Sequence, residues 1–194
     1  MCRLRAIVLA AAVAAAFAPL AARAQQPPDP AVLLDAQREA MVMLKPMLGV
    51  WRGSAWTLRP SGEKHTIVQT ERIGPFLDGS VTVIEGRGHE PDGRVSFNAF
   101  GIVSYNVATR AYSMRSYAQG LAGDFPFVPT ANGYRWEIPA GPARIRFTAT
   151  IENGTLHEIG ERLVPDKEPV VFFEMTLKRL GDSDWPAAGA IGPN

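Results

Sequence analysis

The chain has 194 residues, with 20 Lys and Arg, 19 Asp and Glu, and one cysteine. Its hydrophobic share of 46 % is enough for one sizeable core, so we expect a single globular domain. The near-neutral charge argues against nucleic-acid binding, which needs a basic face, and the single cysteine excludes a disulfide scaffold.

Residues 1–24 are predicted to be a cleaved signal peptide. A basic start is followed by the apolar run Ala6–Leu20 and by Ala22-Arg23-Ala24, the small-x-small pattern that signal peptidase reads. The run is shorter than the ~20 residues that a membrane span requires. We therefore expect cleavage between Ala24 and Gln25, a periplasmic or secreted protein, and no integral membrane span afterwards. Cleavage also removes Cys2, and with it any thiol nucleophile or thiolate metal ligand.

Residues 25–46 predict an extended leader followed by one helix. Asp29 is a suitable N-cap, and Pro30 suits the first helical position, where no backbone N–H is needed. Apolar residues then recur at intervals of three or four, and Pro46 ends the pattern. Such a stripe is expected to pack on a sheet of the same domain, and partner binding is the alternative.

From Leu48 onward the hydrophobic period changes to two, which predicts β-strands. The expected strands lie at 50–59, 63–73, 80–89, 95–106, 110–119, 133–139, 143–151, 155–164 and 169–180. Turn sequences such as Pro91-Asp92-Gly93 and Glu152-Asn153-Gly154 make the links short, so consecutive strands should pair antiparallel.

Closing these strands on themselves removes two exposed sheet edges. The predicted fold is mainly β: a single antiparallel up-and-down barrel of about nine or ten strands with one short N-terminal helix. The barrel domain should span 47–180, followed by a flexible C-terminal tail at 181–194. An outer-membrane barrel is the alternative, and Arg144, Arg146 and Glu174 disfavour it because charges on a lipid-facing surface are costly.

A resemblance to known families supports this fold. The stretch Gly49-Val50-Trp51 after a short helix resembles the start of the calycins: lipocalins, fatty-acid-binding proteins and nitrobindin-like barrels. Together with Gly101–Asn106, Tyr134–Glu137 and Phe172–Leu177, it is similar to a family of exported bacterial domains of unknown function with lipocalin-like barrels. The resemblance covers about residues 45–180 and implies a cavity for a small apolar or amphipathic ligand or for haem.

Alternation along the strands sorts side chains into faces. The candidate ligand-binding residues are Trp51, Arg52, Glu71, Glu85, Tyr105, Arg115, Tyr117 and Trp136. Glu71 and Glu85 share faces with aliphatic residues, so an inward Arg52 would be a partner for either acid. The stretch Gln119–Asp124 is expected to be a loop that gates the barrel mouth. The alternative is an interior filled by side chains, with no space for a ligand.

Other functions have less support in the sequence. His157 and Glu161 resemble a helical metal pair, but on a strand they would lie ~13 Å apart, so no metal site is expected. No cofactor is expected either, and haem bound through His157 is the alternative. His65 and His89 are expected to be exposed. No nucleophile motif or phosphate-binding loop is present in the sequence, so an enzyme would have to use acid–base chemistry, with Glu71 or Glu85 and Arg115 or Tyr117. The oligomeric state is not predicted.

Overall fold

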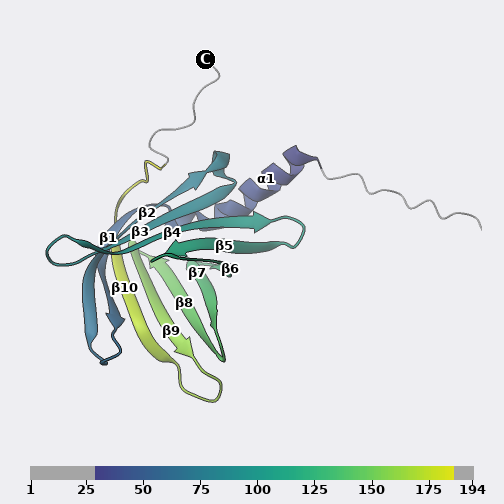
Figure 1. Cartoon of the computed structure of the whole chain (residues 1–194). Coiled ribbons are helices and arrows are strands. Elements are labelled where there is room, and N and C mark those ends of the chain that lie inside the picture. Colours follow the sequence, from purple (N-terminus) through teal and green to yellow (C-terminus); the bar gives the residue numbers. More distant parts are fainter. Residues whose placement is uncertain (1–28, 186–194) are drawn as a thin grey trace, which may run out of the picture.

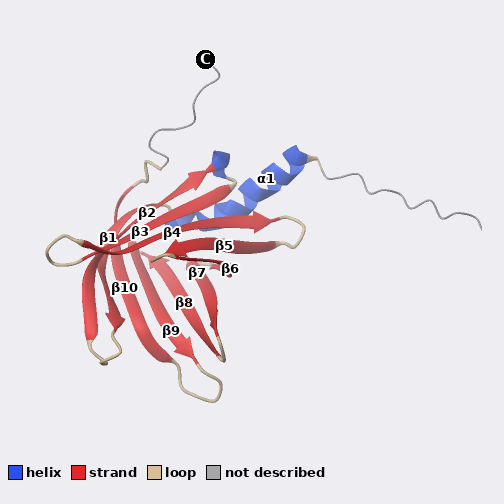
Figure 2. Cartoon of the chain, viewed as in Figure 1, coloured by secondary structure: helices blue, strands red, loops and turns tan. Residues whose placement is uncertain are grey.

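The computed structural model describes residues 29–185. Helix α1 spans Pro30–Met41, and the 3-10 helix η1 follows at Val42–Met47 (Figure 2). Asp29 caps α1 as predicted, because its Oδ1 accepts a hydrogen bond from the Ala31 backbone N–H at 2.9 Å. The α-helical part ends before Pro46, which lies inside η1. Within the described chain, neither helix is long and apolar enough to cross a membrane.

Ten antiparallel strands form a closed barrel (Figure 1). Each strand pairs with its neighbours in the sequence, and β1 closes the sheet on β10, which confirms the predicted up-and-down barrel. A third short helix, η2, spans Leu77–Gly79 between β2 and β3. The strands are β1 Gly49–Leu58, β2 Lys64–Phe76, β3 Val81–His89, β4 Val95–Asn106, β5 Ala111–Ala118, β6 Leu121–Thr130, β7 Gly133–Ala140, β8 Ala143–Glu152, β9 Thr155–Leu163 and β10 Val170–Gly181.

Strand β6 was not among the nine predicted strands. Its sequence contains Gly123, Pro126 and Pro129, residues that weaken a strand signal because glycine adds no packing and proline donates no hydrogen bond. The prediction of a gating loop at Gln119–Asp124 is therefore wrong. Gln119 and Gly120, with φ of 50° and 82°, form a tight hairpin turn, and β6 begins directly after it.

One end of the barrel is closed by the helical segment and by the start of β1. The Trp51 side chain is fully buried, and its Nε1 donates a hydrogen bond to the Met47 carbonyl at 3.0 Å. Leu44 and Met47 pack beside it in the core, so the predicted packing of the helix on the sheet is confirmed. Gly49 lets the chain enter β1 at this end of the barrel. A Cβ at this position would lie 2.8 Å from the Gly181 carbonyl oxygen, and its φ of +142° disfavours any other residue.

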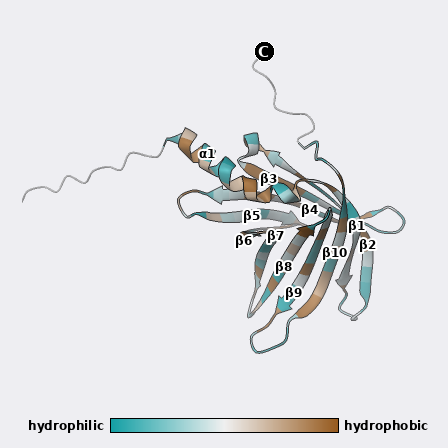
Figure 3. Cartoon of the chain, turned by 180° about the vertical axis from the view of Figure 1, so that it is seen from behind, coloured by the Kyte–Doolittle hydropathy of each residue, from teal (hydrophilic) through white to brown (hydrophobic). Residues whose placement is uncertain are grey.

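Alternate residues of each strand face the interior, as predicted from the period of two. Hydrophobic and hydrophilic residues both occur along the strands and on α1, as expected for elements with one side toward a core (Figure 3). On β4, for example, Gly101 and Val103 are buried, whereas Asn98 is exposed. On β7, β8 and β10, the inward-facing Tyr134, Ala149 and Met175 are likewise buried.

The chain that follows β10 lies against the outer face of the barrel. The Trp185 ring packs on Phe100 of β4 with centroids 6.1 Å apart, and the Arg72 guanidinium lies 4.2 Å over the same ring. This contact adds a packed residue to the segment that was predicted to be a flexible tail. The predicted signal peptide at 1–24, the leader residues 25–28 and the end of the tail at 186–194 lie outside the described residues.

Replacing Trp51 tests the importance of the closed end. We expect Trp51→Ala to lower the free energy of unfolding by about 3–5 kcal/mol, because it leaves a cavity and removes the donor to a buried carbonyl. Trp56→Ala on the same strand is the matched control, since Trp56 lies on the outer face with its Nε1 bonded to Glu174 at 3.0 Å. Urea unfolding would measure both, and equal losses would contradict the assigned role of Trp51.

Candidate functional site: a barrel cavity with two carboxyl groups

The barrel encloses a cavity of about 500 Å³. It begins above the core at the helical end and reaches the opposite end, where Thr57, Ser96 and Ile138 line it beside the hairpin turns. The helical segment formed by α1 and η1, which we call the helical plug, therefore bounds the cavity at one end. The cavity extends toward the opposite, hairpin end of the barrel, which we call the mouth. The wall includes the side chains of Ile67, Gln69, Glu71, Ile84, Phe97, Met114, Ser116, Phe127, Tyr134, Trp136, Phe147, Glu158, Phe173 and Met175.

Aromatic rings form one side of the cavity. Trp136 of β7 stacks on Phe147 of β8 with centroids 4.4 Å apart and an angle of 11° between the planes. Phe127 stacks on Tyr134 at 5.2 Å, and Phe173 meets the edge of Phe147 at 5.8 Å. Offset and edge-to-face contacts of this kind hold rings in fixed orientations. The aromatic wall is thus a rigid apolar surface from neighbouring strands.

A polar cluster lies within this apolar wall. Gln69 and Glu71 come from β2, Tyr134 and Trp136 from β7, and Glu158 from β9. The Trp136 Nε1 donates to Glu158 Oε1 at 3.4 Å, and the Tyr134 hydroxyl hydrogen-bonds to the same carboxyl group. Strands distant in the sequence therefore place two carboxyl groups in one cavity.

Glycines on β3 leave the space into which the Gln69 and Glu71 side chains extend. A Cβ at Gly86 would lie 3.3 Å from Gln69 Nε2 and 3.6 Å from Glu71 Oε1. A Cβ at Gly88 would lie 3.3 Å from Gln69 Oε1. A Cβ at either position would therefore crowd the Gln69 amide, and at Gly88 it would also clash with the Ile67 side chain.

Burial makes both carboxyl groups weak acids. Desolvation, together with the negative charge of Glu158, raises the pKa of Glu71 from 4.5 to about 8. Desolvation likewise raises the pKa of Glu158 to about 7, against the lowering effect of hydrogen bonds from Trp136 and Tyr134. Burial and the two nearby carboxyl groups also raise the pKa of the Tyr134 hydroxyl. Near neutral pH the two carboxyl groups are therefore only partly ionised.

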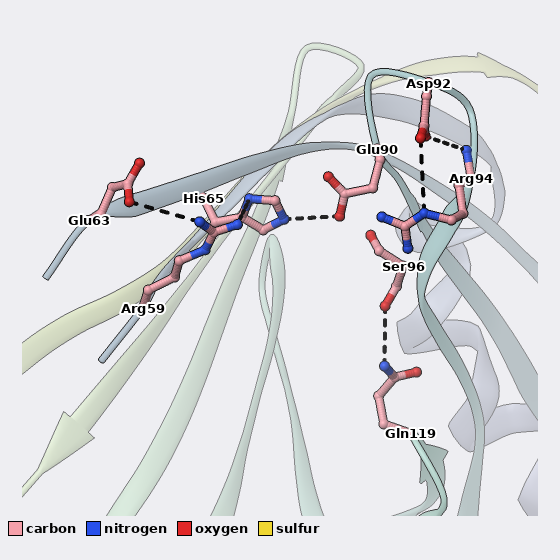
Figure 4. Close-up of polar contacts among 8 residues, drawn as sticks. All are labelled: Arg59, Glu63, His65, Glu90, Asp92, Arg94, Ser96 and Gln119. Atoms are coloured by element: carbon pink, nitrogen blue, oxygen red, sulfur yellow. Dashed lines mark hydrogen bonds and ion pairs between the residues drawn. The ribbon is translucent and has the colours of Figure 1, made fainter. Parts of the chain in front are cut away.

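A second polar network borders the mouth, between the β1–β2 and β3–β4 hairpins (Figure 4). Arg59 Nη2 lies 2.8 Å from His65 Nδ1, and His65 Nε2 lies 3.0 Å from Glu90 Oε1. Because a guanidinium can only donate, Nδ1 accepts and Nε2 donates to Glu90. A Ser96 side-chain hydrogen bond, followed by the contact with His65, lowers the pKa of Glu90. The exposure predicted for His65 is wrong, since it is half-buried and lines the cavity.

Four of the eight predicted site residues point into the barrel. Glu71 and Trp136 line the cavity itself. Trp51 and Tyr105 lie deeper, in the packed core at the helical end, where Tyr105 contacts Tyr112 with ring centroids 4.8 Å apart. The sequence therefore identified one acid and one aromatic residue of the cavity, together with two residues of its floor.

The other four predicted site residues lie on the outer face, so their expected inward placement is wrong. Arg52 is exposed, and Glu85 pairs with Arg72 at 3.0 Å. Arg115 bonds to Asp124, and Tyr117 is 45 % exposed. Side chains alternate between the two faces of a strand, so the sequence neighbours of these four residues face the interior instead. The predicted pairing of Glu71 with Arg115 or Tyr117 is therefore impossible across the barrel wall.

His157 also lies outside the barrel. Its Nε2 hydrogen-bonds to Glu174 Oε1 at 2.9 Å, and its side chain is 37 % exposed. A haem in the cavity would thus lie on the other side of the strand from this imidazole. The described residues contain no group of three or more His, Cys, Asp and Glu side chains positioned to hold a metal ion. The neighbouring Glu158 is the site residue that sequence reasoning missed, although alternation with His157 was the available signal.

Comparisons with known proteins do not assign a family to the chain. No family model matches the chain, and no curated protein matches it.

The two raised pKa values predict a pH-dependent stability. Both acids titrate near pH 4.5 in the unfolded chain but at about 8 and about 7 in the fold. The stabilising contribution of the protonated carboxyls is complete below about pH 4.5 and is lost as pH rises through these values, because the unfolded chain then binds fewer protons. We expect the free energy of unfolding, from urea titrations, to fall by several kcal/mol between about pH 5 and about pH 8.

The variant Glu71→Gln/Glu158→Gln should remove most of this slope, because glutamine does not ionise. Glu85→Gln is the control, since its carboxyl group is on the outer face and ion-paired with Arg72. A double variant that kept the slope of the unmodified protein would contradict the assignment of the two buried acids.

Proposed function

We propose that the protein binds a small, mostly apolar molecule inside the barrel and holds one polar group of that molecule at the Glu71–Glu158 cluster. The observation that carries this proposal is the cavity of about 500 Å³, lined by aromatic and aliphatic side chains around a few polar ones. Small-molecule sites typically have volumes of ~300–1,000 Å³ and the same mixture of an apolar wall and few polar groups.

The volume favours binding over a purely structural role. A side-chain-filled barrel would leave voids of little more than one water molecule, because protein cores pack densely. The Glu71 and Glu158 carboxyl groups would also be costly to bury if they served only to fill the core. A ligand that displaces water from the apolar wall and hydrogen-bonds to the cluster uses both features.

The route into the site is the mouth, since the helical plug closes the other end. We further propose that the ligand is met outside the cytoplasm, because residues 1–24 have the pattern of a cleaved signal peptide. A lipocalin-like binding role also agrees with the resemblance of Gly49-Val50-Trp51 to the calycins. Periplasmic or secreted location and calycin kinship are both parts of this proposal.

Proton transfer to or from the bound molecule is a second candidate function. It rests on the pKa values of about 8 for Glu71 and about 7 for Glu158, which suit a general acid or base near neutral pH. Conversion of a molecule recovered with the protein, by the unmodified protein and not by Glu71→Gln, would favour catalysis. Unchanged release of that molecule would favour binding alone.

A pair of variants on β5 tests binding in the cavity. Ser116 lines the cavity, whereas Ser113 on the same strand is exposed. We expect the neutral fluorophore N-phenyl-1-naphthylamine to bind the unmodified protein and Ser113→Phe equally. Ser116→Phe should weaken its binding about tenfold or more by filling the cavity, a difference of about 1.4 kcal/mol. Fluorescence titration measures all three proteins.

Equal binding to Ser116→Phe and Ser113→Phe would place the fluorophore outside the barrel and contradict the proposal. Native mass spectrometry of the protein purified from its own organism gives an independent measurement. A bound small molecule that is present with Ser113→Phe and absent with Ser116→Phe is the expected result.

A further inference from the structure

The acids inside the barrel differ from those outside in having no cationic partner. On the outer face, Glu85 pairs with Arg72 at 3.0 Å, and Glu137 pairs with Arg146 at 3.0 Å. Among residues 29–185, neither Glu71 nor Glu158 has a Lys, Arg or His within ion-pair distance. Glu158 is only 7 % exposed, and buried carboxylates in proteins are normally paired with a cation or bound to a metal.

The cavity wall supplies no such cation. Of the described residues that line it, none is Lys or Arg, and the single histidine is His65 at the mouth. His65 accepts from Arg59 at Nδ1 and donates to Glu90 from Nε2, so both of its nitrogens are already engaged away from the cluster. The polar groups nearest Glu158 are the neutral Trp136 and Tyr134. Near neutral pH Glu158, whose pKa is about 7, therefore carries negative charge without a counter-charge from the described wall, while Glu71, whose pKa is about 8, is mostly protonated.

From the cavity, its two carboxyl groups and the missing counter-charge, we propose that the ligand is an organic cation. It would carry one protonated amine on an apolar or aromatic body, with the amine between Glu71 and Glu158 and the body along the aromatic wall. This inference rests on the proposed function, since it names the ligand class of the same cavity.

The chemistry of the surrounding groups suits an ammonium group. Its N–H donors match acceptor oxygens of the two carboxyl groups and of the Gln69 amide, which is 4 % exposed. The stacked rings of Trp136 and Phe147 offer π faces, which attract cations when water is excluded. An anionic ligand such as a fatty acid would add a like charge beside the carboxyl groups in a poorly solvated site. The cavity therefore favours amines over alcohols and alcohols over carboxylates.

Three probes with the same tail and different head groups test this order. Octylamine, 1-octanol and octanoate would compete with N-phenyl-1-naphthylamine at pH 7.5 and fixed ionic strength. We expect octylamine to bind about tenfold or more tightly than 1-octanol, and octanoate to bind more weakly than 1-octanol. Glu158→Gln, which is nearly isosteric, should lose most of the preference for octylamine over 1-octanol.

Glu85→Gln is the matched control and should keep the preference, because its side chain lies outside. Equal affinities for octylamine and 1-octanol, or an octylamine preference unchanged in Glu158→Gln, would overturn this inference and leave the proposed binding function standing. Displacement by none of the three probes, with fluorophore binding unaffected by Ser116→Phe, would overturn both.

Discussion

Closure of β1 on β10 is the constraint on which the rest of the structure depends. In a closed sheet every strand has an inside and an outside, and each side chain must take one or the other. Alternation then decides which polar residues reach bulk water and which face the cavity. Glu71 and Glu158 face inward because of their phase in β2 and β9, and they are desolvated for that reason.

The helical plug gives the closed sheet two unlike ends. Trp51, held by the Met47 carbonyl, fills the interior at one end, while the hairpin end keeps the cavity. Glycines on β3 and the stacked rings of β7 and β8 then shape the remaining space. Packing is therefore dense where the chain enters the barrel and sparse where a small molecule would arrive.

The buried carboxyl groups of Glu71 and Glu158 lower the free energy of unfolding at neutral pH, because their pKa values are raised in the fold. Carboxyl groups on the outer face avoid this cost, because they reach water and have cationic partners. Glu85 pairs with Arg72, and Glu174 pairs with His157. Features that weaken a fold without local compensation commonly mark functional sites. The missing compensation at Glu158 is a positive charge, and a bound organic cation would supply it.

The amino-acid sequence alone was enough to predict the capped helix, nine of the ten antiparallel strands and most of their turns, because these depend on neighbours within a few residues. It also placed Trp136 and Glu71 on inward faces. It did not reveal β6, whose glycine and prolines conceal its strand pattern, nor the outward phase of Arg52, Glu85, Arg115 and Tyr117. Phase and the meeting of Glu71 with Glu158 were decided only by the tertiary structure, because a one-residue shift reverses a strand's faces and only closure brings β2 near β9.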